Sequence, residues 1–186
     1  MKVEIENALN HLKQNNIFLY PTDTVWGIGC DATSREAVKK VYDLKQREDS
    51  KALICLVNSV QMLADYVGEI PAKALPYLET VDRPTTIIYP NAKHFAPNLI
   101  AADGSIAIRI CHTPFCQGLI TQFGKPIVST SANLSGTPTP QTFKNIQAEI
   151  KNGVDYIVNL PDDNTPSKPS RIIRFDNEGN IHIIRE

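Results

Sequence analysis

Apolar residues recur along the chain with two spacings that alternate from one segment to the next. Ile5, Leu9 and Leu12 lie three to four positions apart, which predicts a first helix over 3–15. The short apolar run 17–20 follows it and is typical of a buried strand. Further short apolar or alternating runs predict strands over 53–57, 85–89, 105–110, 126–129, 156–159, 171–175 and 181–185.

Residues that cap helices separate these strands. Thr33 and Glu36 have the spacing of a capping box, so we expect Thr33 to begin the second helix. Further helices are predicted after Ser59, from Pro71, between Thr113 and Gly124, and over 140–152 up to Gly153. The stretch DNEGN is typical of a hairpin turn between the last two strands. Because helices and strands alternate, the pattern predicts an α/β fold, a mixed sheet with helices on its faces.

The composition suits one globular domain over residues 1–186. Of the 186 residues, 42% are hydrophobic and 21% are charged. The formal net charge of −1 argues against a protein that binds nucleic acid mainly through the phosphate backbone, because such proteins carry a basic excess. The sequence shows neither an apolar run long enough for a membrane span nor a secretory signal pattern. We therefore expect a cytoplasmic protein that does not associate with membranes.

Cysteine and histidine residues offer no pattern for metal binding. The four cysteines form no CxxC pair, so we expect buried, reduced thiols rather than a zinc or thioredoxin site. The four histidines are scattered without metal-ligand spacing. A GxSxG motif and an evident nucleophile–base pair are also missing from the sequence.

The stretch YPTDTVWGIGCDA, residues 20–32, leaves the first strand with hydroxyl groups, one carboxylate and two glycines. Gly27 and Gly29 lack the third glycine of a dinucleotide fingerprint, and no Walker A motif surrounds them. They fit either a strand that needs close backbone approach or a loop that holds a ligand. In the simplest interpretation, Asp23 caps the turn.

Three cations, Lys45, Arg47 and Lys51, lie within seven residues at the exit of the second helix. Each alone can complement the helix dipole, whereas together they suit phosphate oxygens. The stretch VSTSANLSG, residues 128–136, fits either an anion-binding nest or an ordinary polar turn. Arg109, within the alternating strand SIAIRI, faces either solvent or a cleft. These residues predict a small ligand that bears phosphate.

Taken together, YPTDTVWGIGCDA, LKQREDSKALICLV, IAIRI and VSTSANLSG resemble the YrdC/Sua family of threonylcarbamoyl-adenylate synthases. The resemblance runs from about Ile17 to Arg185 and includes two paired signatures, Lys-x-Arg at 45–47 and Ser-x-Asn at 131–133. It implies a twisted, mixed and largely antiparallel sheet around a basic cavity. It also implies that L-threonine, bicarbonate and ATP, with Mg²⁺ carried on the ATP, give threonylcarbamoyl-AMP and pyrophosphate. Partner proteins then transfer the threonylcarbamoyl group to an adenosine beside the anticodon of certain tRNAs.

The resemblance also assigns roles to individual residues. Lys45 and Arg47 match the family's catalytic residues at the phosphates. The residues expected to hold threonine are Thr22, Thr24, Lys51, Thr86, Arg109, Ser131 and Ser170, with Thr22 supporting Thr24. The residues expected at the nucleotide are Lys45, Arg47, Ser131, Asn133 and Arg185. The resemblance implies no metal site in the protein itself.

One segment departs from the family pattern. Where members have Trp-Pro-Gly-Pro-x-Thr, this chain has VDRPTT over 81–86, which keeps the second proline and the last threonine. The alternative is therefore a YciO-like paralogue with a different role. Two further alternatives are a double-stranded RNA-binding module that uses the same basic cavity and a carbamoyl-transfer domain that uses carbamoyl phosphate. The sequence stops just after Arg185, as in the short, single-domain members of the family.

Overall fold

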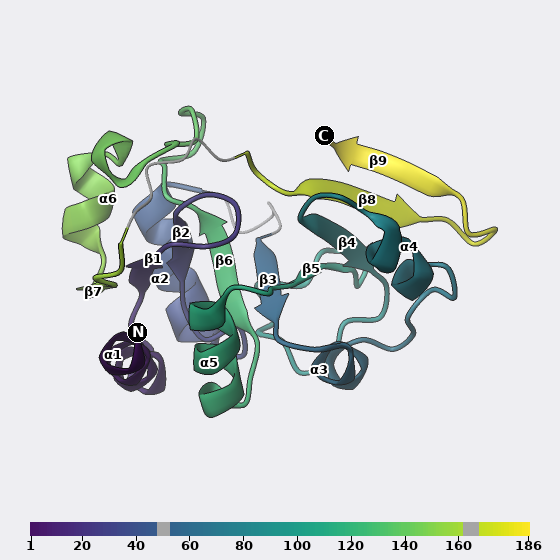
Figure 1. The fold of residues 1–186 in the computed structure, drawn as a ribbon, viewed down its shortest axis with the longest axis horizontal. Helices are drawn as coiled ribbons and strands as arrows, with labels where there is room; N and C mark the ends of the chain where they lie inside the picture. The colour runs from purple at the N-terminus through teal and green to yellow at the C-terminus, as the bar shows by residue number, and fades with distance from the viewer. Residues whose placement is uncertain (48–52, 162–167) are drawn as a thin grey trace.

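The structure, a computed structural model, describes residues 1–47, 53–161 and 168–186. A mixed sheet of nine strands runs through this part of the chain in the order β7-β1-β2-β6-β3-β5-β4-β8-β9 (Figure 1). The strands are β1 (Phe18–Tyr20), β2 (Gly27–Gly29), β3 (Ile54–Val57), β4 (Thr85–Tyr89), β5 (Ile106–Ile110), β6 (Ile127–Ser131), β7 (Tyr156–Ile157), β8 (Arg171–Phe175) and β9 (Ile181–Arg185). The neighbours β1–β7, β3–β5 and β4–β8 are parallel and the other pairs antiparallel, so the prediction of a mixed, largely antiparallel sheet is confirmed.

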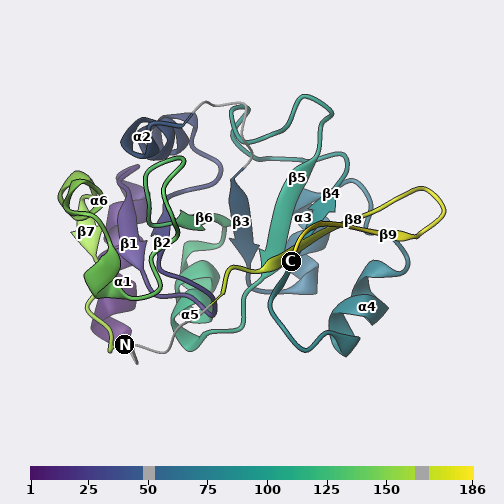
Figure 2. The same cartoon turned by 90° about the horizontal axis from the view of Figure 1, so that it is seen from above.

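Helices cover both faces of this sheet. They are α1 (Lys2–Lys13), α2 (Arg35–Lys45), α3 (Val60–Tyr66), α4 (Ala74–Thr80), α5 (Pro114–Phe123), α6 (Ala148–Gly153) and the 3₁₀ turn η1 (Phe143–Asn145). Figure 2 shows α2 on one side of β1, β2 and β6, with α1 and α5 on the other side. Within the described residues, no helix is long and apolar enough to cross a membrane.

Alternate residues of β1 supply the two apolar cores between these layers. Phe18 and Tyr20 pack in the core that contains Leu12 of α1 and Leu119 of α5. Leu19 points the other way, into the larger core that contains the buried face of α2. Because successive side chains of a strand point to opposite faces, a strand that is buried on both faces is apolar throughout. This explains the continuous apolar run that predicted β1.

The second helix begins one residue later than we expected. Ser34 caps α2, since its Oγ accepts a hydrogen bond from the Ala37 N–H at 3.2 Å. Thr33 donates both its N–H and its hydroxyl to Asp31 Oδ1, each at 2.7 Å. The prediction that Thr33 caps the helix was wrong because the Asp31 carboxylate engages Thr33 in a turn ahead of the helix.

Two further segments differ from their predicted form. Residues 140–152 contain η1 and the short α6 instead of one helix, and the predicted strand 156–159 is reduced to β7. Gly27 and Gly29 belong to a strand, β2, which pairs with β1 and β6. At Gly29 a Cβ atom would lie 2.7 Å from a ring carbon of Tyr20, so close ring packing requires glycine at this position.

Candidate active site

A cavity of about 160 Å³ lies where β2, β3, β5 and β6 meet the segment that leads into β8. The predicted site residues that line it are Thr24, Arg47, Arg109, Ser131, Ser170 and Arg185. The wall is completed by Val25, Gly27, Leu53, Ile54, Ser129, Thr130, Thr139, Pro169 and Ile172. Three guanidinium groups and several hydroxyl groups therefore face one space, a combination that suits a ligand with anionic oxygens.

Thr24 is held in the wall by the residue predicted to support it. The Thr22 hydroxyl lies 3.0 Å from the Thr24 hydroxyl and accepts a hydrogen bond from the Thr24 N–H, also at 3.0 Å. Thr22 itself donates to the Val25 carbonyl at 2.8 Å and does not line the cavity. These bonds fix the backbone and the side chain of Thr24 before any ligand arrives.

Ser170 is supported in the same way from the neighbouring strand. Its hydroxyl lies 2.8 Å from that of Thr86, which is completely buried in β4. Arg185 donates to the Ser170 carbonyl at 2.8 Å and 3.2 Å. Burial, followed by the charges of Arg109 and Arg83, lowers the pKa of Arg185. Arg185 is thus repelled by neighbouring positive charges, and an anionic ligand would offset this repulsion.

Arg109 projects from β5 into the cavity wall and is 4% exposed, so its solvent-facing interpretation is wrong. It forms an ion pair with Asp23 and a longer hydrogen bond of 3.4 Å to the Thr24 hydroxyl. Burial opposes the charged form, but the Asp23 carboxylate outweighs it and raises the pKa of Arg109. Its Nε is buried and has no hydrogen-bond partner among the described residues. The wall therefore contains a buried donor that the described residues leave unsatisfied.

Lys45 does not line the cavity, although we expected it to point there with Arg47. Its ammonium donates to the backbone carbonyls of Ser131 and Asn133, the second at 2.6 Å. The Asn133 side chain also turns away from the cavity and donates to the carbonyls of Leu134 and Thr137, at 3.0 Å and 2.7 Å. Neither Lys45 nor Asn133 therefore lines the cavity, although both bond to the backbone next to Ser131.

Arg47 follows α2 by two residues and lines the cavity as predicted. Gln46 adopts a left-handed conformation with φ 50°, and the Arg47 N–H bonds back to the Tyr42 carbonyl at 3.0 Å. This turn directs the chain away from the helix axis. Burial lowers the pKa of Arg47. Lys51, the third predicted cation of this segment, lies outside the described residues.

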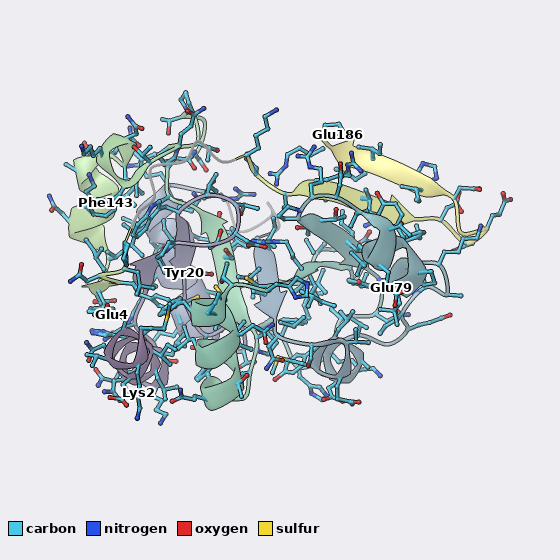
Figure 3. All side chains as sticks on the ribbon, in the orientation of Figure 1. Lys2, Glu4, Tyr20, Glu79, Phe143 and Glu186 are labelled. Carbon is cyan, nitrogen blue, oxygen red and sulfur yellow. The ribbon has the colours of Figure 1, made fainter. Side chains whose placement is uncertain are left out.

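The other arginines near the C-terminal strands are engaged outside the cavity. Glu186 follows β9 (Figure 3) and accepts hydrogen bonds from Arg83 at 3.3 Å and from Arg171 at 3.1 Å. Arg174 pairs with Asp103 at 3.0 Å. None of these three arginines lines the cavity, so the guanidinium groups that face it are those of Arg47, Arg109 and Arg185.

The altered family segment lines a second cavity. Val81, Asp82, Arg83, Pro84 and Thr85 border a space of about 380 Å³ together with Asp23 and His112. Thr86, the next residue of β4, is the one that bonds to Ser170. The change from the family pattern therefore alters the neighbouring space and leaves the threonine that supports the main cavity in place.

Several wall residues were not predicted. Ser129 and Thr130 belong to β6, the strand that carries Ser131. Because residues two positions apart in a strand share a face, Ser129 could have been predicted from Ser131. The pairing of Asp23 with Arg109 has no local signal, because the two residues are 86 positions apart. The described residues contain no group of three His, Cys, Asp or Glu side chains placed to hold a metal ion.

The chain matches a known family over almost its whole length. The model of the Sua5/YciO/YrdC family, described as "Telomere recombination", matches residues 10–186. The chain belongs to the Sua5/YciO/YrdC family. A family relative, threonylcarbamoyl-AMP synthase of Vibrio parahaemolyticus, is 33% identical over 179 residues, which cover 91% of this chain and 97% of the relative.

Solved structures of the Sua5/YciO/YrdC family share the fold. P. abyssi Sua5 complexed with L-threonine superposes with a TM-score of 0.86 at 23% identity and covers all of this chain, which spans 54% of the Sua5 chain. E. coli YciO gives a TM-score of 0.86 at 21% identity and covers all of this chain and 90% of its own. At these identities the likeness shows the fold of the family and does not distinguish its members.

Proposed function

We propose that this protein is an L-threonylcarbamoyladenylate synthase, which makes threonylcarbamoyl-AMP and pyrophosphate from L-threonine, bicarbonate and ATP. The observation that supports this best is the cavity in which Arg47, Arg109 and Arg185 face the hydroxyl groups of Thr24, Ser131 and Ser170. The similarity to a threonylcarbamoyl-AMP synthase over nearly the whole length of both chains supports it as well.

In this proposal, threonine binds at the side of the cavity formed by Thr24, Arg109 and Ser170. The Arg109 guanidinium suits the threonine carboxylate, since it lines the cavity while Asp23 holds it in place. The hydroxyl groups suit the amino-acid hydroxyl. Thr22 and Thr86 support the contact residues and do not themselves reach the cavity wall.

The nucleotide binds beside threonine, near Arg47, Ser131 and Arg185. We place Mg²⁺ on the phosphates of ATP, as part of the substrate. The threonine amine adds to the carbon of CO₂ supplied by bicarbonate and loses a proton, which gives a carbamate. A carbamate oxygen attacks the α-phosphorus, the bond from this phosphorus to the bridging oxygen breaks, and pyrophosphate leaves. Positioning and charge stabilisation by the arginines supply most of what this transfer needs.

The product serves tRNA modification, so we place the protein in the cytoplasm with partner proteins that transfer the threonylcarbamoyl group to tRNA. A YciO-like role is not favoured, because YciO is 21% identical to this chain and the V. parahaemolyticus synthase 33%. Double-stranded RNA binding is not favoured either, since no observation of the cavity points to it.

The test is release of pyrophosphate from purified protein with ATP, bicarbonate and single amino acids. We expect threonine to exceed valine by about four orders of magnitude in kcat/KM, because a site that bonds a hydroxyl rejects the analogue that lacks it. Carbamoyl phosphate in place of threonine and bicarbonate should give no AMP product. Equal turnover with valine, or turnover with carbamoyl phosphate, would contradict the proposed function.

A further inference from the structure

Lys45, the last residue of α2, contacts alternate positions of the loop that follows β6. Its backbone carbonyl accepts a hydrogen bond from the Ser135 N–H at 2.9 Å. Its ammonium donates to the carbonyl of Asn133 at 2.6 Å and to that of Ser131. One residue thus holds the loop 131–135 at three points, and it does so with both its main chain and its side chain.

The surroundings of Lys45 are those of a structural contact in the interior. The residue is 1% exposed, and it is absent from the cavity wall. An ammonium group in the interior is costly unless its donors are satisfied, and hydrogen bonds from a charged donor are stronger than neutral ones. The two loop carbonyls provide this compensation, so the loop and the lysine stabilise each other.

The position of the loop determines where two wall residues lie. Ser131, the last residue of β6, is where the loop begins, and it lines the cavity, while Arg47 lines it two residues beyond Lys45. Lys45 is therefore linked to Arg47 through the chain, by way of Gln46, and to Ser131 through a hydrogen bond. A shift of about 1 Å in such a wall is enough to reduce a reaction rate by two orders of magnitude.

We propose that Lys45 is a positioning residue that fixes the loop 131–135 against the C-terminus of α2, so that Ser131 and Arg47 keep a fixed relation across the cavity. Its effect on catalysis rests on the proposed function, whereas its effect on the loop does not. Burial, followed by the charge of Arg47, lowers the pKa of Lys45 to about 7. A neutral amine retains two N–H donors, so both carbonyls stay bonded in either protonation state.

The first test is hydrogen exchange of the ligand-free protein, which needs no activity. Lys45→Met keeps an unbranched side chain and removes the donors. We expect the amides of 131–136 to exchange about tenfold faster or more, as the loss of hydrogen bonds with a charged donor implies, while the amides of α1 and α5 change little. The control is Lys39→Met, on the exposed face of the same helix, which should leave loop exchange unchanged.

The kinetic test compares the same two variants. If Lys45 positions Ser131 and Arg47, Lys45→Met should lower kcat and leave the KM for ATP within about threefold, since the wall residues remain present but misaligned. Unchanged loop exchange together with a rise confined to the KM for ATP would mean that Lys45 contacts the nucleotide directly, and this outcome overturns the proposal.

A third measurement uses the unmodified chain, so it decides the matter even if Lys45→Met does not fold. We expect the ¹⁵N spectrum of the lysine ammonium groups, recorded below the pKa of Lys45, to show one slowly exchanging signal in the ligand-free protein. That signal should persist with little shift when a non-hydrolysable ATP analogue is added. A Lys45 signal that becomes protected only with the analogue would refute the proposal. Because none of these spectra depends on turnover, failure of the proposed function leaves this test intact.

Discussion

The Asp23 carboxylate and the Arg109 guanidinium form an ion pair between the two cavities of the molecule. Arg109 lines the smaller, basic cavity, and Asp23 lines the larger space beside the altered segment 81–86. The Arg109 side chain is 3% exposed and that of Asp23 is 19% exposed. The pair therefore separates two environments and holds the one arginine of the site that the sheet encloses almost completely.

Removing the charge of Asp23 should destabilise the fold. Breaking a fully buried ion pair costs 3–5 kcal/mol, and because Asp23 is partly exposed we expect Asp23→Asn to lower the free energy of unfolding by about 2 kcal/mol. The measurement is urea denaturation. The control is Asp43→Asn, which breaks an exposed pair with Lys39 and should cost less than about 1 kcal/mol. Equal losses in the two variants would show that burial does not strengthen the Asp23–Arg109 pair.

Arg47 should act on the reaction rate. One preorganised donor at a charged transition state is worth roughly 2.7–4 kcal/mol, so Arg47→Ala should lower kcat about 10²–10³-fold. Arg47→Lys should restore only part of this, because a point charge does not reproduce a two-pronged contact. The melting temperature should change little, because removing this cation relieves its repulsion with Lys45.

The control for Arg47 is Arg35→Ala, an exposed arginine at the first turn of α2. It should leave kcat unaltered. Near-normal pyrophosphate release by Arg47→Ala with a lowered melting temperature would identify Arg47 as a structural residue and contradict its place in the site.

Thr86→Val should test the support of Ser170. Valine has the shape of threonine but leaves the Ser170 hydroxyl without its partner at 2.8 Å. The unpaired hydroxyl should lower the free energy of unfolding by about 1–2 kcal/mol. Because Ser170 is then held less firmly, the KM for threonine should rise by roughly threefold to tenfold. Thr85→Val removes the hydroxyl of the neighbouring residue, which borders the second cavity, and should leave the KM for threonine unchanged. Matching KM changes in both variants would argue against a specific role for Thr86.

Lys45 should make stability depend on pH above neutrality. Its pKa falls from the ordinary 10.5 to about 7 in the folded protein, so between these values the unfolded chain binds a proton that the folded chain does not. Stability should therefore rise with pH across this window, by up to about 1.4 kcal/mol per pH unit. The rise should be less steep in Lys45→Met than in Lys39→Met, as measured by urea denaturation at several pH values, and part of it should remain because the pKa of Cys111 is also lowered to about 7. Equal slopes in the two variants would show that Lys45 does not contribute to the rise.

The sequence predicted those parts of the fold that depend on local patterns. The apolar run of β1 follows from burial on both faces, and Leu19 and Phe18 indeed face opposite cores. The strand β2 had no such pattern, because Gly29 and Gly27 surround a single isoleucine. The requirement for glycine there comes from the rings of Tyr20 and Phe18 on the neighbouring strand, which the local sequence does not reveal.

The sequence indicated which residues belong to the candidate site better than it indicated where their side chains lie. Thr24, Arg109 and Ser170 line one cavity, as the resemblance implied. The burial of the Lys45 side chain against loop carbonyls was not predictable from its place at a helix end. Its partners Ser131 and Asn133 lie 86 and 88 positions away in the sequence. A local pattern indicates that a cation ends the helix, whereas only the packed sheet decides which carbonyls lie within reach of it.

The strand order described above has a consequence for how the molecule folds. The cavity needs β2 beside β6 and β4 beside β8, pairings between segments that are distant in the sequence. Such long-range pairings are slow to form, so the cavity should be completed late in folding. A ligand that binds only the completed cavity then favours the native state, by RT ln(1 + [L]/Kd). Threonine and nucleotide should accordingly raise the melting temperature of the whole sheet, including the edge strand β7, which does not line the cavity.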